Sequence, residues 1–172
     1  MSTSLRHRLQ AHKTPVIYAG VALIATGALL ASYGVFGLLK NDPAPTYETL
    51  LPQHTTAEDL GGWQKISPPE SEPVFAYRDE IDSVAISVSQ QPLPASFAGN
   101  TSGSVKQLAE SYNANTILET GEVVAYLGQS ARGPQSVIFA KNGLLVLIKS
   151  EQAISKEQWS VYINELAKPA RN

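Results

Sequence analysis

The feature that most constrains this chain is an apolar run, residues 15–39, that contains no Asp, Glu, Lys, Arg or His. As a helix, this run would be about 37 Å long, against about 30 Å for the hydrocarbon core of a bilayer. A helix pairs its backbone polar groups within the segment, as the bilayer interior requires, and a tilt accommodates the excess length. The run therefore predicts a single N-terminal transmembrane helix.

The charges on either side of the run predict its orientation. Arg6, Arg8 and Lys13 precede it, whereas Lys40 alone follows it closely. Because the positively charged flank stays in the cytoplasm, residues 1–14 are predicted to be a cytoplasmic tail, with the C-terminal part of the chain outside the cytoplasm. The predicted localisation is the cell membrane, single-pass. The competing hypothesis is a cleaved signal peptide, but its apolar core would be about 7–15 residues long.

Small residues recur along the predicted transmembrane helix. Gly20, Gly27 and Gly34 are spaced by seven, and Ala31 follows Gly27 by four. This spacing places them on one stripe, where small side chains let a second helix approach closely. The stripe is compatible with transmembrane self-association. The alternative is that membrane helices are simply rich in Gly and Ala.

The residues beyond the apolar run predict a tether followed by a folded domain. Residues 40–54 contain three prolines and no period and are predicted to be the tether, while 55–172 are predicted to be the extracytoplasmic domain. Beyond Lys40 there are nine Lys/Arg against fifteen Asp/Glu, with no basic patch, which argues against nucleic-acid binding. The absence of cysteine excludes disulfides, thiolate metal sites and a Cys nucleophile.

The first half of this domain predicts one short helix, three strands and one longer helix. Thr55 or Thr56 can cap a short helix, and Asp79–Asp82 is predicted to be a hairpin tip. Ser104, with Gln107 three residues later, is predicted to cap the longer helix. The expected strands cover residues 63–66, 74–78 and 83–90, and the buried stripe of the longer helix is Val105, Leu108, Ala109 and Tyr112.

The last third of the chain predicts two hairpins and a final helix. Asn142-Gly143 is a strong hairpin signal between strands 135–141 and 144–150, and a second pair is expected at 116–119 and 122–127. Ser155 and Gln158 predict the capping of a helix whose buried stripe is Trp159, Tyr162, Ile163 and Leu166. Strands connected by tight hairpins and interrupted by helices predict an α+β domain, an antiparallel sheet with two main packed helices.

Several strings of the domain resemble known sequences. Gly61-Gly62-Trp63, Ser89–Pro94 and Gly133–Leu145 are similar to strings in uncharacterised single-pass membrane proteins of Saccharibacteria-type bacteria. The C-terminal hairpin and helix more loosely resemble a domain of unknown function in anti-sigma-like, membrane-anchored proteins of Gram-positive bacteria. Neither family has an established activity. The resemblance therefore implies a bacterial cell envelope and an extracytoplasmic domain, without any catalytic residue.

The familiar catalytic and metal-binding patterns are missing from the sequence. His7 and His12 belong to the predicted tail, and His54 belongs to the tether, so no histidine lies in the predicted domain for a Ser-His-Asp arrangement or a zinc site. The carboxylates Asp79, Glu80 and Asp82 crowd one predicted turn but lack calcium-loop spacing. No catalytic, metal or cofactor site is predicted.

What remains is a predicted contact surface and three hypotheses of function. The surface comprises the residues Trp63, Tyr77, Gln90, Gln91 and Arg132, against the alternative that Trp63 is core and Arg132 merely solvated. The favoured hypothesis is a non-catalytic, membrane-anchored binding module with a protein or ligand partner in the envelope. The alternatives are a transmembrane signalling component that acts through a membrane partner, and an extracytoplasmic hydrolase that uses a pair of carboxylates.

Overall fold

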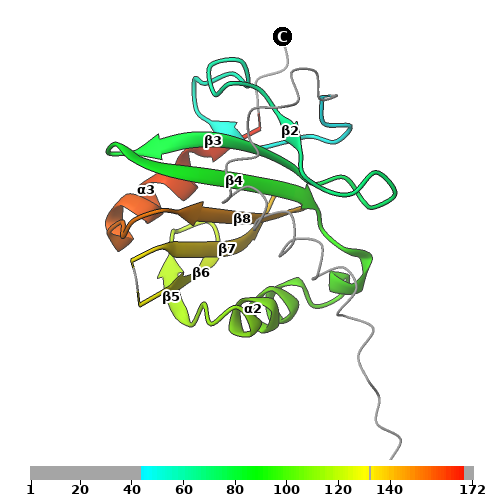
Figure 1. Cartoon of the computed structure of the whole chain (residues 1–172). Coiled ribbons are helices and arrows are strands. Elements are labelled where there is room, and N and C mark those ends of the chain that lie inside the picture. The colour runs from blue at the N-terminus through cyan, green and yellow to red at the C-terminus, as the bar shows by residue number, and fades with distance from the viewer. Residues whose placement is uncertain (1–43, 132, 169–172) are drawn as a thin grey trace, which may run out of the picture.

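The computed structural model describes residues 44–131 and 133–168, so the predicted tail, transmembrane helix and small-residue stripe lie outside the described residues. Among the described residues, none of the helices combines the length and the apolar character needed to cross a bilayer. This part of the chain is α+β, with a seven-stranded antiparallel sheet and two α-helices (Figure 1), which confirms that part of the predicted fold class. The elements of the sheet and its helices are β2 (Gln64–Lys65), β3 (Phe75–Ile81), β4 (Val84–Pro92), α2 (Thr101–Ser111), β5 (Thr116–Glu119), β6 (Val124–Gln129), β7 (Gln135–Lys141), β8 (Leu144–Ser150) and α3 (Lys156–Glu165).

The strand order of the sheet is β2-β3-β4-β8-β7-β6-β5. The chain runs through β2, β3 and β4, crosses by way of α2 to the opposite edge, and returns through β5, β6, β7 and β8. β8 then pairs antiparallel with β4, so strands almost sixty residues apart lie together in the middle of the sheet. This central pairing decides which side chains share a face across the whole domain.

Two tight turns set the register of the hairpins. Asn142 and Gly143 have φ angles of 52° and 78°, the left-handed pair that the predicted hairpin requires. Asp82 and Ser83 have φ angles of 48° and 67° and form the same kind of turn between β3 and β4. The predicted tip at Asp79–Asp82 is therefore wrong, because β3 continues to Ile81, whose side chain is buried in the core.

One face of the sheet is covered by α3. Trp159 and Ile163 of α3 and the following Leu166 are fully buried against alternate residues of the strands, such as Val146 and Ile148 of β8. The predicted capping box is present, since Ser155 Oγ accepts from the Gln158 backbone N–H and the Gln158 side chain accepts from the Ser155 N–H. The predicted stripe of the final helix is confirmed.

The other face carries α2 over β6 and β7 and the adjoining part of β8. Val105, Leu108 and Ala109 of the predicted stripe are buried there, beside Ile138 and Leu145, while Tyr112 of the same stripe is half-buried. The helix nevertheless begins three residues before the predicted cap, because Asn100 Oδ1 accepts from the Gly103 N–H at 3.1 Å. A Cβ on Gly103 would lie 2.4 Å from the Asn100 side chain, so a glycine at this position allows Asn100 to fold back and cap the helix.

The predicted tether overlaps the folded domain. Leu50 is fully buried, and β1 (Leu51–Pro52) pairs antiparallel with β9 (Leu166–Ala167) in a separate two-stranded sheet. Gln53 N–H donates to Glu165 O at 3.0 Å. Residues 47–53 are thus part of the domain, and the predicted boundary at residue 54 is wrong. The predicted short helix at Thr55 or Thr56 is a series of turns.

Candidate functional site

The predicted contact surface is mostly interior. Tyr77 and Gln90 are fully buried and Gln91 is 3% exposed, so these three cannot contact a partner, and that part of the prediction is wrong. Trp63 is half-buried and its ring meets Tyr77 edge-on, with the ring centroids 5.1 Å apart. Trp63 therefore belongs to the margin of the core. Arg132 lies outside the described residues.

These buried polar residues stabilise the fold instead. The Gln90 side chain accepts from Leu50 N–H at 2.8 Å and donates to Leu50 O at 2.6 Å. Its amide thus makes the two hydrogen bonds that a neighbouring strand would make with the backbone of the entering chain, residues 47–53. Tyr162 Oη donates to Asp79 Oδ2 at 2.9 Å and lies 3.4 Å from Tyr77 Oη. Burial raises the pKa of both tyrosines, which keeps their hydroxyls protonated as donors.

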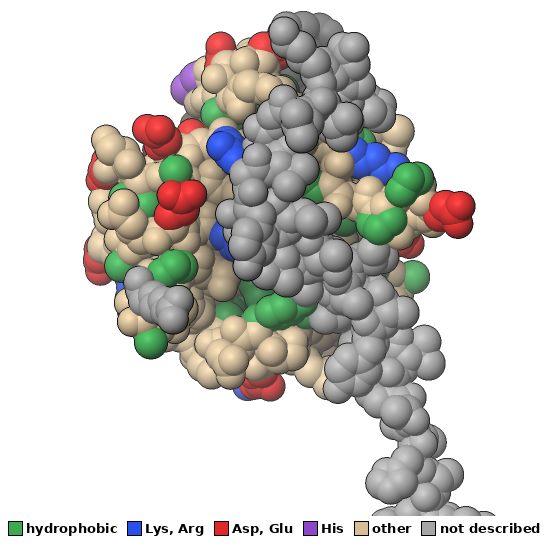
Figure 2. All heavy atoms as spheres, viewed as in Figure 1, with side chains coloured by type: hydrophobic (Ala, Val, Ile, Leu, Met, Phe, Trp, Pro, Cys, Tyr) green, Lys and Arg blue, Asp and Glu red, His purple; other side chains and the backbone are tan. Residues whose placement is uncertain are grey.

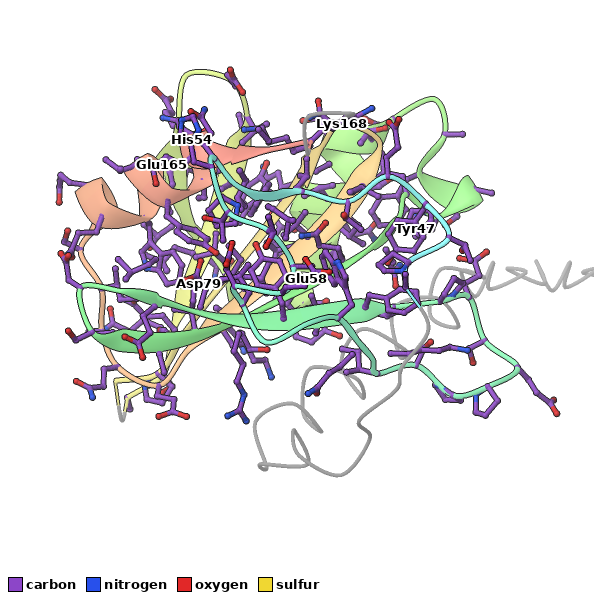
Figure 3. The ribbon with its side chains drawn as sticks, turned by 90° about the horizontal axis from the view of Figure 1, so that it is seen from above. Tyr47, His54, Glu58, Asp79, Glu165 and Lys168 are labelled. Atoms are coloured by element: carbon purple, nitrogen blue, oxygen red, sulfur yellow. The ribbon has the colours of Figure 1, made fainter. Side chains whose placement is uncertain are left out.

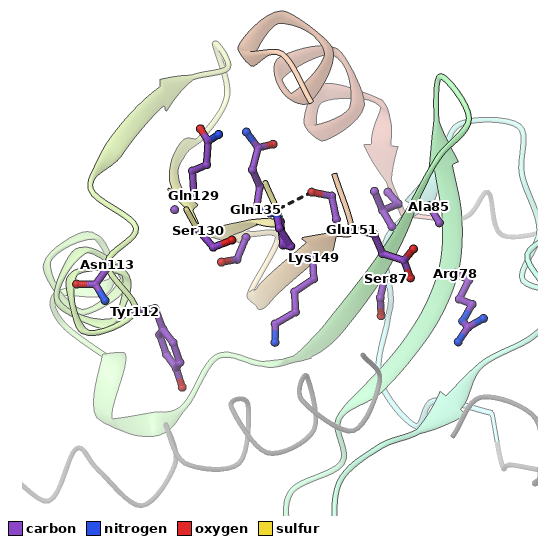
Figure 4. A pocket seen from close by; sticks show the side chains of 15 residues that line it. Arg78, Ala85, Ser87, Tyr112, Asn113, Gln129, Ser130, Gln135, Lys149 and Glu151 are labelled. Carbon is purple, nitrogen blue, oxygen red and sulfur yellow. Dashed lines mark hydrogen bonds between the residues drawn. The ribbon is translucent and has the colours of Figure 1, made fainter. Parts of the chain in front are cut away.

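A cleft of about 620 Å³ opens on the α2 side of the sheet (Figure 4). It lies beyond the last turn of α2, over the ends of β6, β7 and β8 and the adjoining parts of β4 and β3. Its volume is within the range of small-molecule sites. The polar residues that line it are Arg78, Ser87, Tyr112, Asn113, Gln129, Ser130, Gln135, Ser136, Lys149, Ser150 and Glu151.

The floor of the cleft is one cross-strand row. Strand pairing places Gly128 opposite Ser136, Ser136 opposite Lys149, Lys149 opposite Ser87, and Ser87 opposite Arg78. Neighbouring strands are about 4.8 Å apart, so the Lys149 and Arg78 backbones lie about 10 Å apart with Ser87 between them. In Figure 4 the side chains of Tyr112, Lys149, Ser87 and Arg78 all extend toward the same side of the sheet.

Gly128 lets one wall of the cleft come close to the sheet. A Cβ at this position would lie 3.1 Å from Ala114 Cα and 3.3 Å from Asn113 O. Asn113, with a φ of 57°, turns the chain out of α2 there, beside the half-buried Tyr112. The connection from α2 to β5 therefore rests on the sheet at the point where the helix ends and the cleft begins.

Lys149 is the central charge of the cleft. Its side chain is half-buried, and the burial lowers the pKa of its ammonium group. Within the described part of the chain, no carboxylate forms an ion pair with it. The other buried lysine differs: Lys141 Nζ donates to Ile163 O at 3.0 Å and pairs with Glu122 at 3.1 Å. Lys149 thus holds a partly desolvated positive charge that faces the cleft.

A second cleft of about 620 Å³ lies beside the entering chain, between the turn after β1 and the start of β2. Its lining includes Trp63. It also includes His54, Glu58 and Lys168, which are labelled in Figure 3. Lys168 is paired with Glu48, and His54 has a φ of 64° in an exposed turn. Each of the two clefts contains one carboxylate among the described residues, so neither brings together the pair that the hydrolase alternative requires.

The described ranges, 44–131 and 133–168, contain no cluster of three or more His, Cys, Asp or Glu that could hold a metal ion.

The residues of the first cleft were not singled out by sequence reasoning, yet one signal pointed to them. The apolar run of β8, Leu144–Ile148, stops at Lys149, and this marks where the cover over the α2 face ends.

Comparison with protein-family models, curated proteins and solved structures finds no match to this chain.

Proposed function

We propose that this protein is a membrane-anchored, extracytoplasmic binding module that is not an enzyme, and that its ligand site is the cleft over Ser87, Ser136 and Lys149. The apolar run at residues 15–39 and the positive residues before it support the anchor and its orientation. The domain starts only a few residues beyond that run, because Tyr47 and Leu50 already pack into it. The domain would therefore be held close to the extracytoplasmic surface of the anchoring bilayer.

The single observation that carries the binding proposal is the half-buried ammonium of Lys149 in a cleft of ligand size. A charge that is partly removed from water without an ion-pair partner raises the free energy of the fold, and a ligand can supply the missing partner. The cleft also combines hydroxyl groups with apolar surface from Ala85 and Pro134, the mixture that small-molecule sites present.

Site-specific photocrosslinking in native membranes tests this proposal on the full chain. A crosslinker at Ser130, an exposed residue on the rim of the cleft, is expected to capture a ligand or partner. The control is Val161, which is 57% exposed on α3, on the opposite side of the sheet. Equal adducts at both positions, or none at Ser130, would contradict the proposed site. Protease added to intact cells should cleave the domain, and protection of the domain would contradict the orientation.

A further inference from the structure

The chemistry of the cleft floor identifies the class of ligand. We propose that the cleft binds a small amphipathic anion through a phosphate or carboxylate group, with Lys149 as the principal charge and Ser87 and Ser136 as hydrogen-bond donors. This inference rests on the proposed function and deepens it, since it names what the same site recognises. The anionic group is common to soluble metabolites and lipid headgroups, and the experiment below distinguishes these sources.

The first argument is the arrangement of donors around one point. Lys149 has Ser136 as its partner on β7 and Ser87 as its partner on β4, so a hydroxyl lies on each side of the ammonium within one strand spacing. Arg78 continues the row on β3 at the exposed end. An anion above Lys149 could accept charge-assisted hydrogen bonds from the ammonium and from both hydroxyls at once.

The second argument is that this site is positive in a domain that is otherwise negative. The residues beyond Lys40 carry an excess of six acids. Among the side chains that stay visible in Figure 2, Asp and Glu lie mostly along the margins of the molecule. Among the described residues, only Glu151 contributes a carboxylate to the cleft. It is exposed directly after β8, where its backbone N–H donates to Ala85 O at 3.4 Å. An anion is therefore favoured at Lys149 by local rather than by overall charge.

The third argument concerns the rest of the ligand. The Tyr112 ring, Ala85 and Pro134 add apolar surface beside the row, and the cleft volume of about 620 Å³ exceeds what an inorganic anion fills. A ligand that has an apolar or aromatic body next to its anionic group would use both parts of the cleft. Phenyl phosphate and benzoate are suitable probes, with benzyl alcohol as the neutral probe of similar size.

The test measures binding to the full chain in neutral detergent by the shifts of backbone amide resonances at residues 87, 136 and 149. Phenyl phosphate or benzoate is expected to shift these resonances, and benzyl alcohol to shift them at least about tenfold more weakly, since charged hydrogen bonds are the strong ones. Lys149→Met should weaken anion binding about tenfold. Lys156→Met, which removes an exposed lysine from the α3 side, should leave it unchanged.

Ser87→Ala and Ser136→Ala should each weaken binding severalfold, and they keep the test informative if Lys149→Met does not fold. Nanodiscs of phosphatidylglycerol, compared with phosphatidylcholine, provide the lipid arm. If Lys149-dependent shifts appear with phosphatidylglycerol and not with the soluble probes, the ligand is a lipid headgroup. If they appear with the soluble probes, the ligand is a free anion. Both outcomes support the inference. Equal binding of benzyl alcohol and phenyl phosphate, or anion binding unaffected by Lys149→Met, would overturn it. If benzyl alcohol bound at these residues as well as the anions did, the anion inference would fail, but the proposal that the cleft is a binding site would stand.

Discussion

The two faces of the sheet are made from alternate residues of the same strands, yet they differ in how completely they are covered. On the α3 face, Val146, Ile148 and Trp159 are fully buried in one continuous cluster. On the α2 face, the helix covers the region around Ile138 and Leu145, and the cover ends at the row that contains Lys149. Under the proposed function, this difference would separate stability from recognition, with the sealed face providing the first and the cleft the second.

The largest effect should come from the sealed face. Trp159→Ala removes a fully buried ring and the donor that reaches Gln135 Oε1 at 2.8 Å. We expect a loss of about 3–5 kcal/mol in the free energy of unfolding, measured by urea denaturation. The matched change on the cleft face, Ser87→Ala, should stay within about 0.5 kcal/mol. Similar losses for the two variants would remove the contrast between the faces.

Gly128→Ala tests the boundary between the covered and open parts of the α2 face. The added methyl would press on Ala114 and Asn113 O at 3.1–3.3 Å, and overpacking of this kind costs about 1–3 kcal/mol. Thermal unfolding measures the cost. Ser136→Ala, the neighbour in the same row, is the control and should have little effect. An unchanged unfolding temperature in Gly128→Ala would show that the connection from α2 to β5 can move away from the sheet at no cost in stability.

The helix caps sharpen the comparison between α3 and α2. Ser155→Ala should cost about 1 kcal/mol, because Ser155 Oγ caps α3, and Asn100→Ala should cost a similar amount at the start of α2. Ser104→Ala, inside α2, should be neutral or slightly stabilising, since alanine has the higher helix propensity. Urea denaturation of the three variants measures this order. A loss in Ser104→Ala as large as that in Asn100→Ala would contradict the helix start at Thr101.

The smallest effect should come from Lys149→Met. Burial lowers the pKa of Lys149 in the folded state, so the unfolded chain binds its proton more readily than the folded chain does. The lysine consequently lowers stability at neutral pH, and this penalty fades as the pH rises toward the ordinary lysine pKa of about 10.4. We expect Lys149→Met to be more stable than the wild type by at most about 0.5 kcal/mol at pH 7. The gain should shrink at pH 10, and urea denaturation at both pH values measures it.

An increase of that gain with pH would contradict the placement of the ammonium. So would a clear loss of stability in Lys149→Met at pH 7, since that would indicate a partner already bound to Lys149 within the fold. Lys156→Met, in the exposed first turn of α3, provides the control for the general effect of removing one positive charge at each pH.

The sequence by itself determined the elements whose causes are local. Asn142-Gly143 specified the β7–β8 hairpin, Ser155 and Gln158 specified the start of α3, and the unbroken run Leu144–Ile148 indicated a strand covered on both faces. Each of these depends on residues within a few positions of one another, where backbone geometry and capping act directly.

Only the tertiary structure decided the rest. Gln90 becomes interior because β4 pairs with β8 and because Leu50 hydrogen-bonds the Gln90 side chain. Tyr77 becomes interior on β3, where it meets Trp63 and Tyr162. The same pairing aligns Ser87 with Lys149 and so makes the cleft floor. These contacts join segments about forty to sixty residues apart, and since strand side chains alternate between faces, the register of such a pairing determines which groups meet.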